Sequence, residues 1–266
     1  MSDLVKPKAG ALAAAPDFMQ ADGVAGTAEL VNKMRPSWLK LVQKQSADEL
    51  LTDFGMGSLV LTPEKRLVWA PGDKPRRIIP IFHFSEYLKF SSLLLKDTEP
   101  MIVERSFDPN SETARKANDP RLWEEMHPAH QGDSRYSYRY VHALVFMCVF
   151  QDPDLQSPLP FTISFSKASF STGQSLAGKV VMRRAPLYGC VFELSVDPRP
   201  RKNTKGEWRE LLIENPAEEP WVKDPEEYAK YKQLHERLVA LHAAGEIEVG
   251  DAMDASEEPS TDVGTY

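Results

Sequence analysis

The stretch SFSTGQSLAGKVVMRR, residues 169–184, carries a spacing that could bind phosphate. Gly173 to Lys179 follow the pattern G-x-x-x-x-G-K of a phosphate-binding loop. In a nucleotide-hydrolysing enzyme the next residue is Ser or Thr, whose hydroxyl ligates magnesium, but here it is Val180. The chain also offers consecutive strand-like segments instead of alternating strands and helices. The pattern therefore does not predict a nucleotide-binding enzyme.

The same stretch predicts a short helix with one apolar and one basic side. Ser171 and Gln174 have the spacing of a capping box, and Pro186 should end the helix. The side expected to pack on a sheet comprises Leu176, Ala177, Val180 and Val181. The side expected to face outward carries Lys179 and Arg183, with Arg184 beside them. A solvated face that complements the helix dipole is the alternative for these cations.

Aromatic and basic residues alternate in the segment RYSYRY, residues 135–140. Binding of single-stranded nucleic acid without sequence preference needs cations that follow the phosphates and aromatic rings on which bases stack. Two further segments, FSKASF and PRPRKNTKGEWRE, add the same residue types, the second as a basic hairpin. The predicted DNA-binding residues are Arg135, Tyr136, Tyr138, Arg139, Tyr140, Phe165, Lys167, Phe170, Lys179, Arg183, Arg184, Arg201, Lys202, Lys205, Trp208 and Arg209. Alternating aromatic residues on a strand are also typical of a half-buried core, so this alternative stays open.

The charge is distributed unevenly along the chain. Residues 1–214 contain 28 basic and 26 acidic residues, whereas residues 215–266 contain 4 basic and 13 acidic residues. An acidic tail could occupy the protein's own cationic groove until DNA displaces it, or bind basic partner proteins; a solubilising end is the alternative. The predicted partner-binding residues are Glu257, Glu258, Asp262 and Tyr266.

Strand-like segments dominate the middle of the chain. They are GSLVL, RLVWA, RRIIPIFHF, PMIVERSF, SRYSYRYVHALVFMCVFQ, LPFTISFSKASF, LYGCVFELSV and WRELLIE. We expect a flexible N-terminal arm (1–30), a β-rich nucleic-acid-binding domain (31–214), a C-terminal helix (215–246) and a disordered acidic tail (247–266). Asp224 should cap the C-terminal helix, Pro225 should open it and Gly245 should end it. Residues 108–134 form a long polar excursion from the sheet.

Cysteine and histidine usage argues against disulfide and metal chemistry. Cys148 and Cys190 lie in apolar runs and are expected to be buried thiols. His127 and His130 have a spacing compatible with a metal, but no paired cysteines accompany them, and we expect neither a metal nor a cofactor. No apolar run approaches the roughly 20 residues of a membrane helix, and the N-terminus does not read as a signal peptide.

The order of these segments resembles the single-stranded DNA-binding proteins of tailed bacteriophages. The resemblance rests on LPFTISFSKASFSTGQSLAGKVVMRRAPLYGCVFELSV and KGEWRELLIE, followed by a helix and an acidic C-terminus. It implies an OB-fold-like antiparallel barrel with an embedded helix, and a role in phage DNA replication, recombination and repair without enzymatic activity. It also implies single-stranded DNA and replication proteins, such as a polymerase or helicase-primase, as partners. A homodimer and the cytoplasm of an infected bacterial host fit the same resemblance. The chain departs from it in the 108–134 excursion and in a less acidic end, STDVGTY.

Two other functions remain open from the sequence. One is a phage structural or protein-interaction module without DNA affinity, which would bind through its C-terminal helix. The other is a metal-dependent nuclease that would use His127, His130 and scattered acids. The nuclease would need a tight cluster of Asp and Glu, and no short spacing in the chain supplies one.

Overall fold

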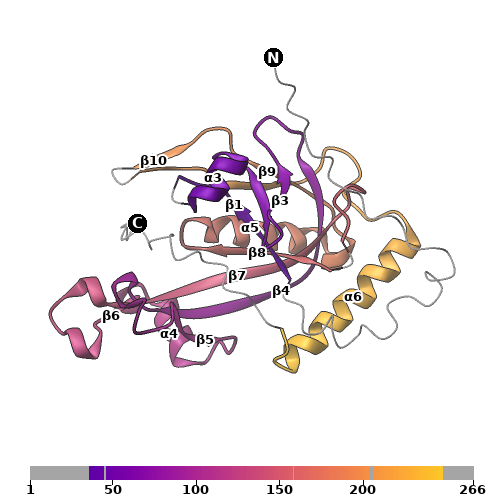
Figure 1. Ribbon diagram of the computed structural model, residues 1–266. Coiled ribbons are helices and arrows are strands. Elements are labelled where there is room, and N and C mark those ends of the chain that lie inside the picture. The colour runs from indigo at the N-terminus through magenta and orange to yellow at the C-terminus, as the bar shows by residue number, and fades with distance from the viewer. Residues whose placement is uncertain (1–35, 45, 158, 204–205, 248–266) are drawn as a thin grey trace, which may run out of the picture. The chain divides into compact units, whose positions relative to one another are not determined.

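The computed structural model describes residues 36–44, 46–157, 159–203 and 206–247 (Figure 1). The predicted arm, residues 1–30, and the tail from residue 248 onward lie outside the described residues, as does Lys205. Contacts divide the chain into two units, Met1–Met34 and Arg35–Tyr266. The described part of the second unit is a β-rich α+β fold built on a strongly curled half-barrel sheet, as predicted at the level of fold class.

The half-barrel sheet follows the order β12-β9-β4-β7-β8-β1-β2-β3, with β5 paired to β4 and β6 paired to β7. Its strands are β1 (Ser37–Leu41), β2 (Leu59–Thr62), β3 (Arg66–Trp69), β4 (Arg76–Phe90), β5 (Ile102–Ser106), β6 (Glu124–Glu125), β7 (Tyr138–Phe150), β8 (Phe161–Ser166), β9 (Phe192–Val196) and β12 (Leu211–Glu214). Neighbours pair antiparallel except β1 and β8, which are parallel. A separate hairpin of β10 (Arg201–Asn203) and β11 (Gly206–Trp208) confirms the predicted basic hairpin.

Four α-helices accompany the sheet within the described residues: α3 (Asp48–Phe54), α4 (Glu112–Asn118), α5 (Phe170–Arg183) and α6 (Pro225–Ala243). The 3₁₀ turns are η1 (Leu93–Leu95), η2 (Pro120–Leu122), η3 (Pro128–His130), η4 (Ser134–Tyr136), η5 (Lys167–Ser169) and η6 (Leu187–Gly189). Helix α6 has the predicted ends. The Asp224 carboxylate accepts from the Glu226 amide at 2.8 Å, and Gly245 follows the helix with a φ of 71°. No helix in the described ranges is long and apolar enough to cross a membrane.

The long strands β4 and β7 form the spine of the sheet. They pair from Ile78 opposite Phe150 to Phe90 opposite Arg139. One half of this pair lies in the half-barrel, and the other half extends beyond it (Figure 1). We call this outer half of the β4–β7 pair the ribbon. The segment FSEYLKF, residues 84–90, is the outer part of β4.

The concave face of the half-barrel encloses the main core, and α5 packs into it. Phe146, Ile163, Phe165 and Phe192 are fully buried there with Leu176 of α5. Cys148 and Cys190 are free buried thiols in the same core, as predicted. Because α5 fills this face, the interior of the half-barrel is not an open groove.

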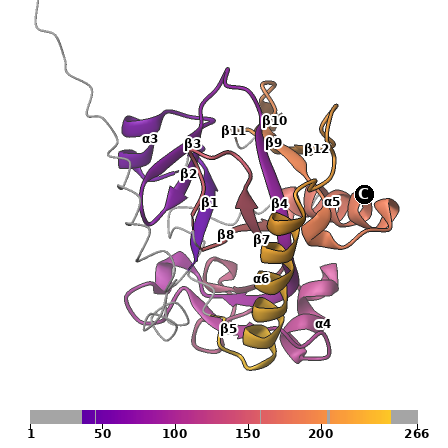
Figure 2. The ribbon, with the colours of Figure 1, turned by 90° about the vertical axis from the view of Figure 1, so that its right-hand side faces the viewer.

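Helix α6 packs against the opposite face of the sheet (Figure 2). Leu238 is buried there with Ile79, Ile81 and Val145. His235 Nδ1 lies 2.7 Å from the Ile81 carbonyl oxygen. The apolar side of α6 is thus used inside the chain, which leaves the protein-interaction alternative without its expected helix face.

The excursion at residues 108–134 is more ordered than the sequence predicts. Helix α4 buries Ala114 and Ala117 against Tyr87 and Tyr140 of the ribbon. Strand β6 adds a short pair to β7. The residues that contact β4 and β7 are small, such as Ala114 and Ala117, or polar, such as Lys116 and Glu125, so no apolar pattern in the segment predicts this packing.

Two local expectations about helix α5 are wrong. The helix begins at Phe170 after η5, so Ser171 and Gln174 lie inside it and do not form its capping box. Instead, the Ser166 amide donates to Ser169 Oγ at 3.0 Å. Val181 was expected on the packed side but is 76% exposed.

Candidate nucleic-acid interface

Three of the predicted stacking rings are buried. Phe165 is 0%, Tyr140 5% and Tyr138 7% exposed. A buried ring has no free face for a base, so the structure contradicts the stacking role predicted for these residues. The alternative reading, a half-buried core strand, is the one that these rings follow.

The two tyrosines of β7 also have their hydroxyl groups engaged. Tyr138 donates to Glu99 Oε1 at 3.1 Å, and Tyr140 donates to Glu125 Oε2 at 2.6 Å. Lys116 of α4 donates to the Tyr140 hydroxyl at 3.2 Å and forms an ion pair with Glu125. Burial, and then the bond to Glu125, raise the pKa of Tyr140 to about 12. The contacts of Tyr140 with Lys116 and Glu125 attach the excursion at residues 108–134 to β7.

The cations expected on the outer side of α5 point inward. Lys179 Nζ donates to the carbonyl oxygen of Ile213 on β12. Arg183 Nη1 donates to the carbonyl oxygens of Val191 at 3.0 Å and Pro220 at 2.9 Å. The prediction of an outward basic stripe is therefore wrong for both residues, because a second chain segment covers this side of the helix. Arg184 remains exposed.

The remaining residues near α5 differ in exposure. Phe170 is half-buried, with its ring centroid 4.7 Å from that of His142. Lys167 is exposed and adopts a left-handed backbone with a φ of 49°. Because Phe165 is buried and Phe170 is half-buried, the segment FSKASF offers no fully exposed ring on which a base could stack.

The basic hairpin, residues 197–210, carries three exposed cations, of which Arg201 and Lys202 were predicted to bind DNA. Its side chains of Arg199, Lys202 and Arg201 are 90%, 69% and 59% exposed. Each lies near one carboxylate: Arg199 Nε is 3.5 Å from Asp197, Lys202 Nζ is 3.1 Å from Glu207, and Arg201 Nη2 is 3.3 Å from Glu210. Exposed ion pairs of this kind are weak, so phosphate oxygens can replace the carboxylates. Segment 197–210 carries five basic and three acidic residues.

Trp208 and Arg209 lie at the base of the hairpin. Trp208 is half-buried, and its ring nitrogen is enclosed. Arg209 Nη1 donates to the Pro198 carbonyl oxygen at 2.8 Å. Arg209 thus closes the hairpin, although it was predicted to contact DNA directly.

A second exposed surface lies at the ribbon tip, residues 124–136. Arg135 lies on η4 and not on the predicted strand, and its side chain is 75% exposed. It forms a bidentate pair with Asp133, and this side-chain hydrogen bonding lowers the pKa of Asp133 to about 2. Tyr136 stacks on His130, with centroids 4.1 Å apart and an interplanar angle of 15°.

The ribbon tip joins a cation to half-buried rings that keep part of their surface in solvent. Arg139 on β7 has its Nε 3.5 Å from Glu124, which ties the adjacent β6 to the strand. Sequence reasoning considered His130 only as a metal ligand and missed its ring contact. The six-residue separation of His130 and Tyr136 gives no periodic signal for that contact.

The histidine pair that the nuclease alternative would use makes other contacts. His127 Nε2 lies 2.8 Å from Glu99 Oε1, and His127 Nδ1 accepts from the Ala129 amide at 3.1 Å. The hydrogen bond to His127 is the largest cause that lowers the pKa of Glu99. No group of three or more His, Cys, Asp or Glu in the described part of the chain could hold a metal ion.

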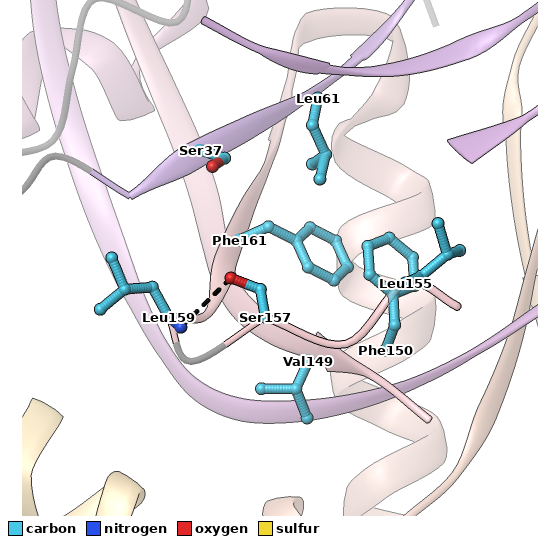
Figure 3. Close-up of a pocket in the computed structure, with 8 residues that line it drawn as sticks. All are labelled: Ser37, Leu61, Val149, Phe150, Leu155, Ser157, Leu159 and Phe161. Atoms are coloured by element: carbon cyan, nitrogen blue, oxygen red, sulfur yellow. Dashed lines mark hydrogen bonds between the residues drawn. The ribbon is translucent and has the colours of Figure 1, made fainter. Parts of the chain in front are cut away.

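A small pocket lies between β1, the end of β7 and the start of β8 (Figure 3). Its lining is mostly apolar, with side chains that include Leu61, Phe150 and Phe161, and its polar side chains are Ser37 and Ser157. Among the described residues, no charged or titratable side chain lines it.

No protein-family model, no curated protein and no solved structure matches this chain significantly.

Proposed function

We propose that the protein binds single-stranded DNA without sequence preference and without enzymatic activity. The observation that supports this most is the basic hairpin, where Arg199, Arg201 and Lys202 project on a two-stranded element of their own. Cations on such an element can follow a flexible phosphate backbone, and phosphate contacts supply most of the affinity in sequence-independent binding.

The ribbon tip supplies the aromatic part of the proposed interface. Tyr136 and His130 are stacked on one another, and Arg135 lies next to them in the chain. Bases can stack on such rings, and the guanidinium can reach a phosphate. In Figure 1 the hairpin and β6 lie toward the same, left-hand end of the described region.

The finer fold and the biological setting belong to the same proposal. A curled, largely antiparallel sheet with helix α5 between β8 and β9 supports a relation to OB folds. With the resemblance to phage proteins, we propose roles in phage replication, recombination and repair in the host cytoplasm. Residues Glu257, Glu258, Asp262 and Tyr266 would contact replication proteins.

A titration of a fluorescent dT oligonucleotide at several salt concentrations tests this proposal. Affinity should fall linearly with the logarithm of salt concentration, because binding releases counterions. The same titration on a chain that ends at Ile247 shows whether the acidic tail competes with DNA. Absence of binding at low salt by both chains would reject DNA binding.

A protein-interaction module is the second candidate, and the outer side of α5 favours it. Its exposed residues are all uncharged: Ser171, Gln174, Ser175, Gly178, Val181 and Met182. Val181 and Met182 are 76% and 82% exposed. Gel filtration with light scattering on the wild type and on Met182→Glu tests for self-association. A complex that Met182→Glu dissolves, in a protein without DNA affinity, would favour this candidate.

A further inference from the structure

The base of the basic hairpin is closed by a set of contacts that we call the neck. The Asp197 amide donates to the Glu210 carbonyl oxygen at 2.9 Å. The Arg209 guanidinium crosses from the returning strand to the outgoing one and donates to the carbonyl oxygens of Pro198 at 2.8 Å and Asp197 at 3.4 Å. The neck continues the β9–β12 ladder, in which Leu211 pairs with Val196, and so joins the hairpin to the edge of the half-barrel sheet.

Gln43, which follows β1, gives the neck a second attachment to the half-barrel. Its side-chain Nε2 donates to the Arg209 carbonyl oxygen at 2.7 Å, and its Oε1 accepts from the Arg209 amide at 3.0 Å. One carboxamide thus pairs with both backbone groups of one residue, in the way that a neighbouring strand would. The two residues are 166 positions apart in the chain.

Gln43 is itself held in place. Its amide donates to Ser46 Oγ at 2.9 Å, and Ser46 is buried. Next to it, the Gly57 amide donates to the Val42 carbonyl oxygen at 2.8 Å. Gly57 has a φ of 90°, and a Cβ there would lie 2.9 Å from Arg209 Cδ. The turn that supports Gln43 therefore leaves room for the Arg209 side chain.

We infer that Gln43 is a positioning residue for DNA binding, and this inference rests on the proposed function. By holding Arg209, it fixes the direction in which Arg201 and Lys202 leave the half-barrel. Without it the hairpin keeps its charges but is held only through the β9–β12 ladder, so its orientation is less restricted and binding must order it each time. Gln43 lies well away in sequence from every basic segment, and no sequence pattern marks it.

The test compares Gln43→Leu, which keeps the size of the side chain and removes both hydrogen bonds, with Gln156→Leu at an exposed position after β7. We measure backbone hydrogen exchange and dT-oligonucleotide affinity over a salt series, in the full chain. In Gln43→Leu, amides of residues 197–203 and 206–210 should exchange faster, while those of β4 and β7 keep their protection. Affinity should fall about tenfold with an unchanged salt slope, since every cation remains. Gln156→Leu should match the wild type in hydrogen exchange, affinity and salt slope.

The outcomes separate this inference from the proposed function. If the wild type binds and Gln43→Leu binds equally well, the positioning role is rejected and DNA binding stands. If neither the wild type nor the chain that ends at Ile247 binds at low salt, both are rejected, whatever the exchange rates. If Gln43→Leu does not fold, Gln43→Glu replaces it, because its side chain keeps the acceptor for the Arg209 amide. Its affinity should fall by less than the tenfold expected for Gln43→Leu. An unchanged affinity in that folded variant would likewise reject the role.

Discussion

The guanidinium carbon of Arg183 lies 4.3 Å from the centroid of the Phe192 ring, and Phe192 is the first residue of β9. The same group donates to the carbonyl oxygens of Val191 and Pro220, and Nη2 donates to Asn215 Oδ1 at 2.7 Å. One side chain thereby joins helix α5, strand β9 and the segment that leads to α6. Arg183 acts as a structural connector at the end of its helix.

Arg183→Ala should destabilise the fold without a matching loss of DNA affinity. The substitution removes the Arg183 donor to the Val191 carbonyl oxygen and one of two donors to the Pro220 carbonyl oxygen, and such losses cost about 1–3 kcal/mol. Urea unfolding followed by circular dichroism measures the change in the free energy of unfolding. Arg184→Ala is the matched control, since Arg184 is exposed, and it should stay within about 0.5 kcal/mol of the wild type. Equal stability of the two variants would contradict the connector role.

The double variant Arg201→Ala/Lys202→Ala should weaken DNA binding and flatten its salt dependence. Each phosphate contact on a single strand contributes about 0.7 to the slope of log affinity against log salt, so two lost contacts should reduce it by about 1.4. The control is Lys223→Ala/Lys232→Ala, which removes the same charge. Lys223 and Lys232 are also exposed and paired with carboxylates, but at α6. If both double variants shift the slope equally, the hairpin has no special role.

Tyr136 and Tyr140 should respond to alanine substitution in opposite ways. Tyr140 is buried, and truncation of a buried aromatic ring costs about 3–5 kcal/mol of stability. Tyr136→Ala should leave stability nearly unchanged and reduce the free energy of DNA binding by about 1–3 kcal/mol, the contribution of one stacked base. Urea unfolding and oligonucleotide titration on both variants measure the two effects. Full DNA affinity in Tyr136→Ala would remove the ribbon tip from the interface.

His242 should make the stability of the fold depend on pH. Its ring lies among Phe82, Phe84 and Phe107, with centroids 5.4, 5.0 and 5.4 Å away, and its Nε2 is enclosed without a partner. Burial lowers the pKa of His242 from 6.5. Below pH 6.5 the unfolded chain therefore binds a proton that the folded chain does not. The free energy of unfolding is at its full value above pH 6.5 and falls as the pH decreases below it.

His242→Phe keeps an aromatic ring in this site and removes the titration. Urea unfolding at a series of pH values from 7.5 to about 5 should show a smaller loss of stability in this variant than in the wild type. The remaining dependence includes His83 and His142, since burial also lowers the pKa values of both groups. The same pH dependence in both proteins would show that His242 is charged in the folded state.

The sequence predicts the elements of this protein better than it predicts which faces are covered. The ends of α6 follow from Asp224, Pro225 and Gly245, because capping is a local property. The burial of Tyr138 depends instead on the loop that carries Glu99, whose carboxylate accepts from the Tyr138 hydroxyl. Periodicity within one strand contains no information about that loop.

The same limit applies to the candidate site. Lys179 and Arg183 have the spacing of an exposed stripe, but β12 and the segment around Pro220 lie against it. The basic hairpin was predictable, since its residues are adjacent in the chain. Gln43 was not, because its role comes from a contact across 166 positions.

The two glycines of the G-x-x-x-x-G-K pattern should have opposite effects when replaced by alanine. Both lie within α5, and neither starts a loop. A Cβ on Gly173 would lie 2.8 Å from the Cβ and 2.9 Å from the Cγ of Phe165, a fully buried residue that cannot move away. A Cβ on Gly178 would meet nothing within 4 Å. Gly173→Ala should therefore lose about 1–3 kcal/mol of stability by overpacking. Gly178→Ala should gain about 1 kcal/mol, because alanine is the better helix former.

Thermal unfolding of the two variants measures these changes in stability. Titration with ATP and magnesium tests the alternative that the pattern forms a phosphate-binding loop. A phosphate-binding loop would need both glycines for close approach of its backbone to phosphate, so both substitutions would impair nucleotide binding. In a helix that packs by one side only, the sign of each effect depends on which side the glycine occupies. A loss of stability in Gly178→Ala would show that another part of the chain, or a second protein, approaches α5 at this position.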